Sequence, residues 1–155
     1  ASFIRVNVLC GARLTDQGLV TGIAHDLLRL RSSLNAEEIR ILADVDVKHS
    51  APLAARPIEE EVGDVIGRGG ADAVIVSGEA TGRAVDSSIL DGVLSAAGET
   101  PVLIGSGVDE SNAAALSSRV AGLIVGSSLK TDGIVTAPVE RSRATRIVQA
   151  ALFSG

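Results

Sequence analysis

Residues 39–49 read Ile-Arg-Ile-Leu-Ala-Asp-Val-Asp-Val-Lys-His, and this stretch decides the fold class. Its first nine residues are rich in branched side chains, which is typical of a β-strand. Side chains of a strand point alternately to opposite faces, so this strand has an apolar row and a second row that carries charge. The apolar row is Ile41, Ala43, Val45 and Val47, and the second row is Leu42, Asp44, Asp46 and Lys48. Such a strand packs one face against helices and needs polar partners on the other.

The same unit recurs along the chain: a short β-rich run, a loop of small residues and then a helical stretch. The expected strands are residues 3–9, 39–47, 73–77, 102–104 and 122–125. Helices are expected at about residues 17–32, from Pro57, after a cap at Asp86, after a cap at Asp109, and from near Pro138. Strands separated by helices pair in parallel, with right-handed crossovers. The sequence therefore predicts an α/β fold of five βα units in one domain that covers residues 1–155.

Two architectures accommodate five βα units: an open doubly wound sheet and a stretch of a (β/α)8 barrel, whose full length is about 250 residues. In an open sheet with helices on both faces, central strands are apolar throughout. Here the first strand alternates as the second does, with Arg5 and Asn7 opposite Ile4 and Val6. Neighbouring strands with polar rows are expected inside a barrel near its open end. Edge strands with one hydrated face would show the same alternation. The alternation favours the C-terminal part of a barrel, with the open sheet as the alternative.

Composition excludes several classes of protein. The formal net charge of −5 leaves no basic patch for nucleic acid. Only Phe3 and Phe153 are aromatic, so bases have no stacking platform. No apolar run is long enough for a transmembrane segment. The single cysteine, Cys10, excludes an internal disulfide and fits a reducing compartment, so we expect a cytoplasmic protein.

Two turns of glycine and serine follow the last two expected strands. They are Gly105-Ser106-Gly107 and Gly126-Ser127-Ser128. Small residues at strand ends leave backbone N–H groups uncovered, and barrel enzymes bind phosphate after their seventh and eighth strands. We expect these six residues to bind a phosphate group. The alternative is that glycine is simply common in βα loops.

A second group of residues could supply acid–base chemistry. Asp44, Asp46 and Lys48 share one strand face, and we expect them to meet Asn7 at the mouth of the barrel. His49 follows in the loop, and Glu79 lies in the small, polar loop of residues 77–82. These six are the candidate catalytic residues, for proton transfer. No zinc-binding spacing is present and no metal ligand set is predicted, although the carboxylates could hold Mg²⁺. The alternative is that charges only pair among themselves: Arg5 with Asp44, and Lys48 with Asp46.

Several segments together resemble one protein family. They are residues 3–8, 15–19, 43–53, 75–82, 105–108, 126–130 and 132–133. On these segments the sequence resembles the BtpA family, and the similarity covers essentially the whole chain. The resemblance implies a (β/α)8 barrel that is either a phosphate-binding enzyme or a factor in photosystem I biogenesis. Family members are longer, and Phe3 matches their fourth barrel strand, so the resemblance implies that the first three βα units are absent from this chain.

Five strands cannot close an eight-stranded barrel, so both ends of the sheet would carry unpaired backbone groups. We expect the missing N-terminal barrel half, or another copy of the chain in a homo-oligomer, to complete it. The leading functional hypothesis is an isomerase, aldolase or transferase that binds a small phosphorylated metabolite without a redox cofactor. The alternatives are an assembly factor for a photosynthetic complex and a metabolite-binding regulator without turnover.

Overall fold

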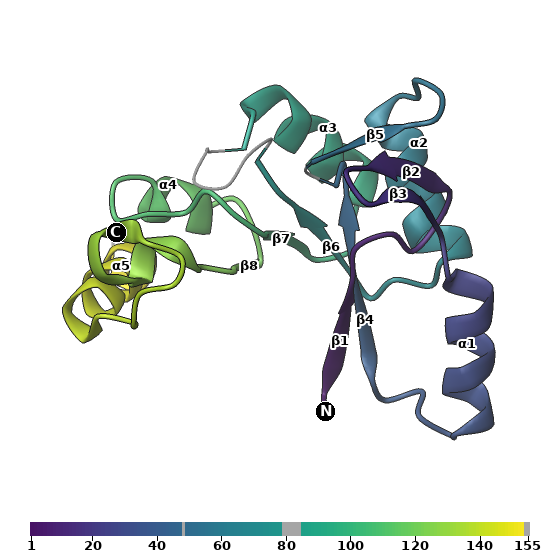
Figure 1. The fold of residues 1–155 in the computed structure, drawn as a ribbon, viewed down its shortest axis with the longest axis horizontal. Coiled ribbons are helices and arrows are strands. Elements are labelled where there is room, and N and C mark those ends of the chain that lie inside the picture. Colours follow the sequence, from purple (N-terminus) through teal and green to yellow (C-terminus); the bar gives the residue numbers. More distant parts are fainter. Residues whose placement is uncertain (48, 79–84, 154–155) are drawn as a thin grey trace.

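Five parallel strands form the main sheet of the computed structural model, which describes residues 1–47, 49–78 and 85–153 (Figure 1). Two candidate residues, Lys48 and Glu79, lie outside the described residues. The strands are β1 (Phe3–Val6), β4 (Arg40–Val45), β6 (Ala73–Val76), β7 (Val102–Ile104) and β8 (Gly122–Leu123), and they lie side by side in this order.

The order of the strands decides between the two architectures. Right-handed crossovers that always step in the same direction place every connecting helix on the same face of the sheet. A doubly wound sheet instead reverses its strand order, which brings helices to both faces. Here each strand pairs with the next parallel strand along the chain. The prediction of a barrel segment is therefore confirmed, and the open sheet is excluded.

The helices cover one face of the sheet. They are α1 (Ala24–Ser33), α2 (Ile58–Gly63), which continues into a π-helical turn η1 (Asp64–Arg68), α3 (Ser87–Ala97), α4 (Ala113–Ser117) and α5 (Arg141–Phe153). Two 3-10 turns, η2 (Ser127–Leu129) and η3 (Thr131–Gly133), precede α5. α2 contacts β4, α3 contacts β6 and β7, and α4 contacts β8. The predicted cap at Asp86 is confirmed, because its carboxylate accepts from the backbone N of Ser88 at 2.7 Å.

The core lies between these helices and alternate residues of each strand. Its strand members include Val6, Ile41, Ala43, Val45, Val74, Val76, Val102 and Ile104. The other row of each strand faces away from the helices, and it contains Phe3, Arg5 and Asp44. Phe3 is 56% exposed on this inner face, as expected of a barrel interior that five strands leave open.

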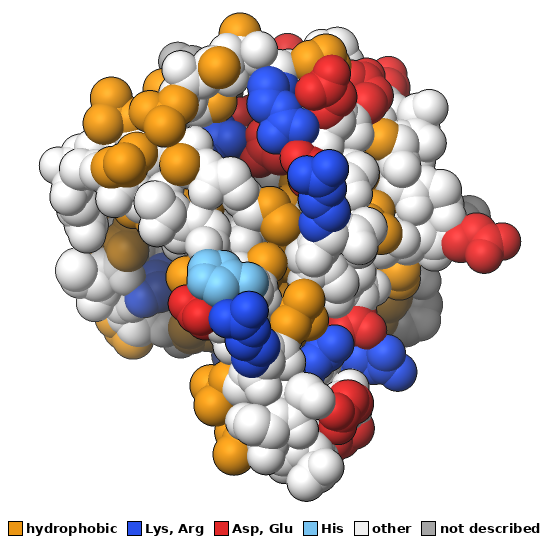
Figure 2. All heavy atoms as spheres, turned by 90° about the vertical axis from the view of Figure 1, so that its right-hand side faces the viewer, with side chains coloured by type: hydrophobic (Ala, Val, Ile, Leu, Met, Phe, Trp, Pro, Cys, Tyr) orange, Lys and Arg blue, Asp and Glu red, His pale blue; other side chains and the backbone are white. Residues whose placement is uncertain are grey.

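The segment before α1 was predicted wrongly. Residues 12–21 form an antiparallel hairpin of β2 (Ala12–Thr15) and β3 (Gly18–Thr21), and β5 (Ser50–Pro52) adds a third strand beside β2. Asp16 lies in the hairpin turn and caps no helix. Gly18 follows that turn with φ of +104°, which glycine adopts without steric cost. Leu19 and Val20 lie within the helix expected at about residues 17–32, yet both are exposed strand residues. Figure 2 shows a group of hydrophobic side chains at the upper left of the face that it draws.

Arg13 connects the hairpin to the main sheet and to the helix α2. Its guanidinium is almost fully buried and donates from Nη1 to both carboxylate oxygens of Glu61, at 3.0 and 3.1 Å. Nε donates to Ser50 Oγ at 2.6 Å, and Nη2 lies 3.2 Å from Asp46 Oδ1. One arginine of β2 thus contacts α2, β5 and the end of β4.

Asp72 stabilises the opposite edge of the sheet, where the parallel strands begin. Its Oδ2 accepts from the backbone N of Ile41 at 2.8 Å, and its Oδ1 accepts from Arg40 at 2.7 Å. These bonds, with the charge of Arg31 nearby, outweigh the effect of burial and lower the pKa of Asp72.

Removing the Arg13 side chain should destabilise the protein. We expect Arg13→Ala to lower the free energy of unfolding by about 2–3 kcal/mol, less than for a fully buried pair because Glu61 and Asp46 keep some contact with water. Denaturant unfolding of the intact protein, followed by circular dichroism, measures this. The control Arg68→Ala removes a well exposed arginine with one weak pair and should change nothing measurable. An equal loss of unfolding free energy in both variants would contradict the structural role assigned to Arg13.

The lowered pKa of Asp72 gives a pH-dependent contribution to stability. Because its pKa is lower in the folded state, this contribution is present above the unfolded pKa, which is about 4, and is lost as the pH falls through the folded value. We expect Asp72→Asn to be less stable than the wild type at pH 7 and to approach it near pH 2. Thermal unfolding across this range tests the expectation, and a constant difference would contradict it.

Candidate functional site

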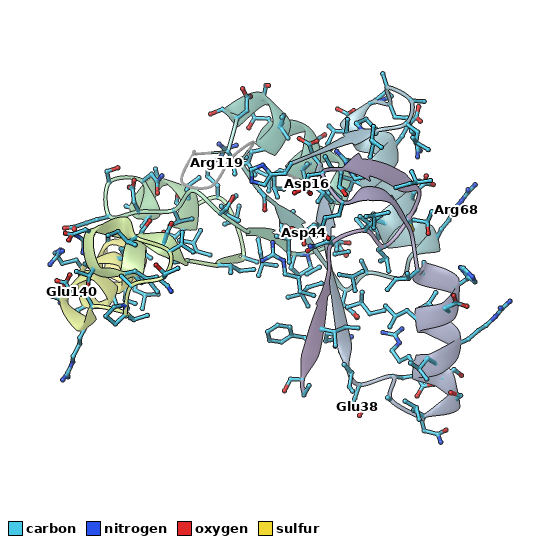
Figure 3. All side chains as sticks on the ribbon, in the orientation of Figure 1. Asp16, Glu38, Asp44, Arg68, Arg119 and Glu140 are labelled. Atoms are coloured by element: carbon cyan, nitrogen blue, oxygen red, sulfur yellow. The ribbon has the colours of Figure 1, made fainter. Side chains whose placement is uncertain are left out.

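A cavity of about 490 Å³ opens on the inner face of the sheet, at the carboxyl ends of the strands. Three of the candidate catalytic residues line it: Asn7, Asp44 and His49. Arg5, Ser77 and Gly105 line it as well, and hairpin residues that include Asp16 form its rim. Figure 3 labels Asp44 at the centre of the sheet and Asp16 on the hairpin. The structure therefore gathers residues from the ends of four strands around one space.

Arg5 and Asp44 form a two-pronged ion pair across β1 and β4. Arg5 Nε donates to Asp44 Oδ2 at 2.8 Å, and Arg5 Nη2 donates to Asp44 Oδ1 at 2.7 Å. Asp44 is buried, and the hydrogen bond to its carboxylate raises the pKa of Arg5. The Arg5–Asp44 pair that sequence analysis offered as the alternative is present. Since both oxygens of Asp44 are engaged, this carboxylate positions Arg5 over the cavity.

Gly105 allows Arg5 to reach the end of β7. A Cβ atom at Gly105 would lie 3.0 Å from Arg5 Nη2, 2.6 Å from Ser77 Oγ and 2.5 Å from a methyl carbon of Ile75. The backbone N of Gly105 donates to Val76 O at 2.7 Å, which keeps this residue close to β6. The missing side chain therefore makes room for the guanidinium and the hydroxyl beside one another.

Ser77 is the least satisfied polar side chain of the site. Only 6% of the residue is exposed, and its Oγ has no hydrogen-bond partner among the residues that the structure describes. Buried hydroxyl groups are nearly always hydrogen-bonded, so a buried one without a partner that lines a cavity indicates a place for a ligand atom.

The turns after β6, β7 and β8 meet at the same edge of the sheet. Gly78 N donates to Ser106 Oγ at 3.1 Å, and Ser128 Oγ donates to Val108 O at 2.6 Å. Gly107 has φ of +75°, and its carbonyl accepts from Asn112 Nδ2 at 2.8 Å. The two glycine–serine turns are thus held next to each other. The hydroxyl of Ser128 is used within the protein, so the donors left at this turn are backbone N–H groups and the hydroxyl of Ser127.

Asp46 is separated from Asp44, contrary to the expectation that both share a face with Lys48. β4 ends at Val45, and Asp46 adopts a left-handed backbone with φ of +47°. The alternation of side chains therefore stops one residue earlier than expected. The carboxylate of Asp46 pairs with Arg13 outside the cavity, and its backbone N donates to Glu61. His49 also has a positive φ, of +57°, and its exposed side chain lies at the rim.

A second cavity, of about 580 Å³, lies beside α5. Its two arginines are already paired: Arg143 Nε lies 3.0 Å from Glu140, and Arg146 Nε lies 2.8 Å from Glu110. Within the described ranges, no group of three or more His, Cys, Asp or Glu side chains could hold a metal ion. No helix in the same part of the chain has the length and apolar character needed to span a membrane.

Two residues of the site were missed from sequence alone. Ser77 was seen only as the start of a loop, and Gly105 only as part of a phosphate-binding turn. The inner row of β6, which contains Ala73 and Ile75, continues to position 77, and this register was the available signal.

Parallel strands in sequential order, helices on one face and polar groups at the carboxyl edge define a segment of a (β/α)8 barrel. The solved structure of phosphoribosyl anthranilate isomerase from Thermococcus kodakaraensis has the same fold. It aligns with a TM-score of 0.62 and 16% identity, over 99% of this chain and 64% of that chain.

The chain belongs to the BtpA family, whose model matches residues 1–152. It is 46% identical over 150 residues to the photosystem I biogenesis protein BtpA of a Synechocystis strain, which is 97% of this chain and 52% of that protein. A protein of Thermococcus kodakarensis is 44% identical over 151 residues, with 97% and 56% covered. A mitochondrial protein of Caenorhabditis elegans is 39% identical over 132 residues, with 84% and 47% covered. The chain thus spans about half the length of the curated relatives it matches.

Filling the space at Gly105 should disturb the site. We expect Gly105→Ala to cost about 1–3 kcal/mol of stability, because the new methyl group must displace Arg5, Ser77 or Ile75. Chemical denaturation of the intact protein measures the cost. Gly63→Ala is the matched control, since the added Cβ meets nothing within 4 Å in a helical backbone. The control should be neutral or stabilising, and the packing argument fails if Gly105→Ala behaves in the same way.

Proposed function

We propose that this chain forms the C-terminal part of a (β/α)8-barrel enzyme that binds a small phosphorylated metabolite at the carboxyl edge of its strands. The observation that carries the proposal is the pair of glycine–serine turns at the carboxyl edge of the sheet: a hydrogen bond from Ser128 to Val108 holds them together, and Gly105 of the first turn lines the 490 Å³ cavity. Phosphate groups of barrel enzymes bind at the turns after the last two strands, where backbone N–H groups are uncovered.

The phosphate would lie against the six residues of these turns, and the rest of the metabolite would occupy the cavity. The turn residues are Gly105, Ser106, Gly107, Gly126, Ser127 and Ser128. Asn7 and His49 line the cavity, and we assign proton transfer to His49. Lys48 and Glu79 follow β4 and β6 in the sequence and stay candidates for the same chemistry. An isomerase, aldolase or transferase reaction fits these groups, and Mg²⁺ could accompany the phosphate.

The proposed barrel needs strands beyond the five that this chain contributes to the main sheet. β1 and β8 each pair on one side only among the described strands, and the relatives are about twice as long as this chain. We propose that an N-terminal barrel half, or a second copy of the chain in a homo-oligomer, supplies the missing strands. A lone thiol at Cys10 supports a cytoplasmic location.

A second candidate function is assembly of a photosynthetic complex without turnover. The name of the Synechocystis relative favours it. The archaeal and animal relatives favour a metabolic role instead, because an animal carries no photosystem I. A regulator that binds the metabolite without turnover would share the phosphate site.

A negative charge introduced at Ser127 tests the proposed phosphate site. Ser127→Asp places a carboxylate beside the bound phosphate, and like-charge repulsion should weaken the affinity for inorganic phosphate by about tenfold or more. Asparagine has nearly the same shape as aspartate but no charge, so Ser127→Asn should bind inorganic phosphate with an affinity within about threefold of the wild type. Isothermal titration calorimetry on the intact protein measures both.

Wild-type protein that binds neither inorganic phosphate nor sn-glycerol 3-phosphate at millimolar concentration would overturn the proposal. Equal affinities of the two variants would also overturn it. An assembly factor that acts through its surface should retain its function in Ser127→Asp.

A further inference from the structure

We infer that the cavity beside Gly105 binds a carbonyl oxygen of the metabolite, with Arg5 and Ser77 as the hydrogen-bond donors. The inference rests on the proposed function, and it narrows the substrate to a phosphorylated aldehyde or ketone. Asp44 is a positioning residue in this arrangement, because it contacts Arg5 and acts through it.

Arg5 has donors to spare. A guanidinium carries five N–H groups, and Asp44 accepts from Nε and from one N–H of Nη2. The remaining donors, on Nη1 and Nη2, have no other partner in the part of the chain that is described. The Arg5 side chain is 34% exposed and lines the cavity, so a ligand can reach these groups.

Ser77 supplies the second donor at the same place. Its Oγ lies 2.6 Å, and Arg5 Nη2 lies 3.0 Å, from the one point where a side chain of Gly105 would begin. Two donors from different strands therefore converge next to a residue that has no side chain. A buried hydroxyl without a partner is costly, and a ligand oxygen in the adjoining cavity, which Arg5 and Ser77 both line, would satisfy it.

The balance of charge selects a carbonyl group. Asp44 cancels the charge of Arg5, so the two donors approach the ligand without net charge. The other carboxylate that lines the cavity, Asp16, is exposed to solvent at the rim. A carboxylate would add a negative charge, and among the described residues that line the cavity the one arginine, Arg5, is already paired with Asp44. A hydroxyl group brings a proton of its own, which a cluster of donors matches less well, and each oxygen of Asp44 already accepts one hydrogen bond from Arg5. A carbonyl oxygen accepts two hydrogen bonds, carries no charge that needs a cation, and has no proton that needs an acceptor.

The same donors would favour a reaction at the carbon next to the carbonyl. When a base such as His49 takes a proton from that carbon, the electron pair of the broken C–H bond forms a C=C bond, and the carbonyl electrons move onto oxygen. Arg5 and Ser77 would then hold an enolate oxygen, whose charge is stabilised by donors fixed in advance. The inference therefore favours an isomerase or an aldolase over the other reaction classes.

Three probes of similar size separate the functional groups. Dihydroxyacetone phosphate carries a carbonyl, sn-glycerol 3-phosphate a hydroxyl and 3-phosphoglycerate a carboxylate. We expect the intact protein to bind dihydroxyacetone phosphate about tenfold more tightly than the other two, a gain equal to roughly one hydrogen bond. The infrared carbonyl band of the bound ketone should move to lower frequency.

Ser77→Ala and Arg5→Lys should each remove the preference and most of the infrared shift, while the affinity for inorganic phosphate stays unchanged. Ser118→Ala is the matched control, since this exposed serine lies at the end of α4, and it should keep both signals. Equal binding of the three probes, or tightest binding of 3-phosphoglycerate, would overturn the inference and leave the phosphate site intact. Failure to bind any of them, or inorganic phosphate, would overturn both proposals.

Discussion

The ion pair between Arg5 and Asp44 is the interaction on which the inner face of the sheet depends. A charged side chain inside a barrel is unfavourable unless a partner satisfies it, and here two short hydrogen bonds join neighbouring strands. The pair keeps the guanidinium at the carboxyl edge of the sheet, where barrel enzymes carry their active sites. Without Asp44 the arginine would turn to solvent, and the polar groups around Gly105 would no longer face one another.

Two arginines of this protein illustrate how burial separates structural from functional roles. Arg13 is almost fully enclosed, and it uses all three of its nitrogen atoms to bind Glu61, Ser50 and Asp46. Four of its five N–H groups are used in this way within a buried side chain, so Arg13 serves to hold the hairpin. Arg5 uses two of its nitrogen atoms on one carboxylate and keeps donors that face a cavity. Both form ion pairs, and only the second arrangement leaves capacity for chemistry.

The sequence predicted the elements whose pattern is local. Alternation in β1 and β4 indicated a polar interior, and Asp86 indicated the start of α3. The hairpin was missed because Leu19 and Val20 fit a helical period over a short window, and only pairing with β2 decides the matter. Asp46 was misplaced because strand alternation ends at Val45, where the backbone turns left-handed. The surroundings of the Ser77 hydroxyl include Gly105, nearly thirty residues away in the sequence. A local sequence pattern therefore could not show that this hydroxyl lacks a hydrogen-bond partner.

In the barrel proposed above, the open edges of the sheet would determine where specificity arises. In a closed eight-stranded cylinder, three further strands would stand between β8 and β1. Their carboxyl ends would lie between the turn at Gly126 on one side and Arg5 on the other. A metabolite with its phosphate at the glycine–serine turns and its carbonyl at Gly105 would be held by this chain at both ends. The segment that completes the barrel would then contact the part of the metabolite that these two sites leave uncovered. Loops that follow the added strands could change the substrate while the two sites stay the same.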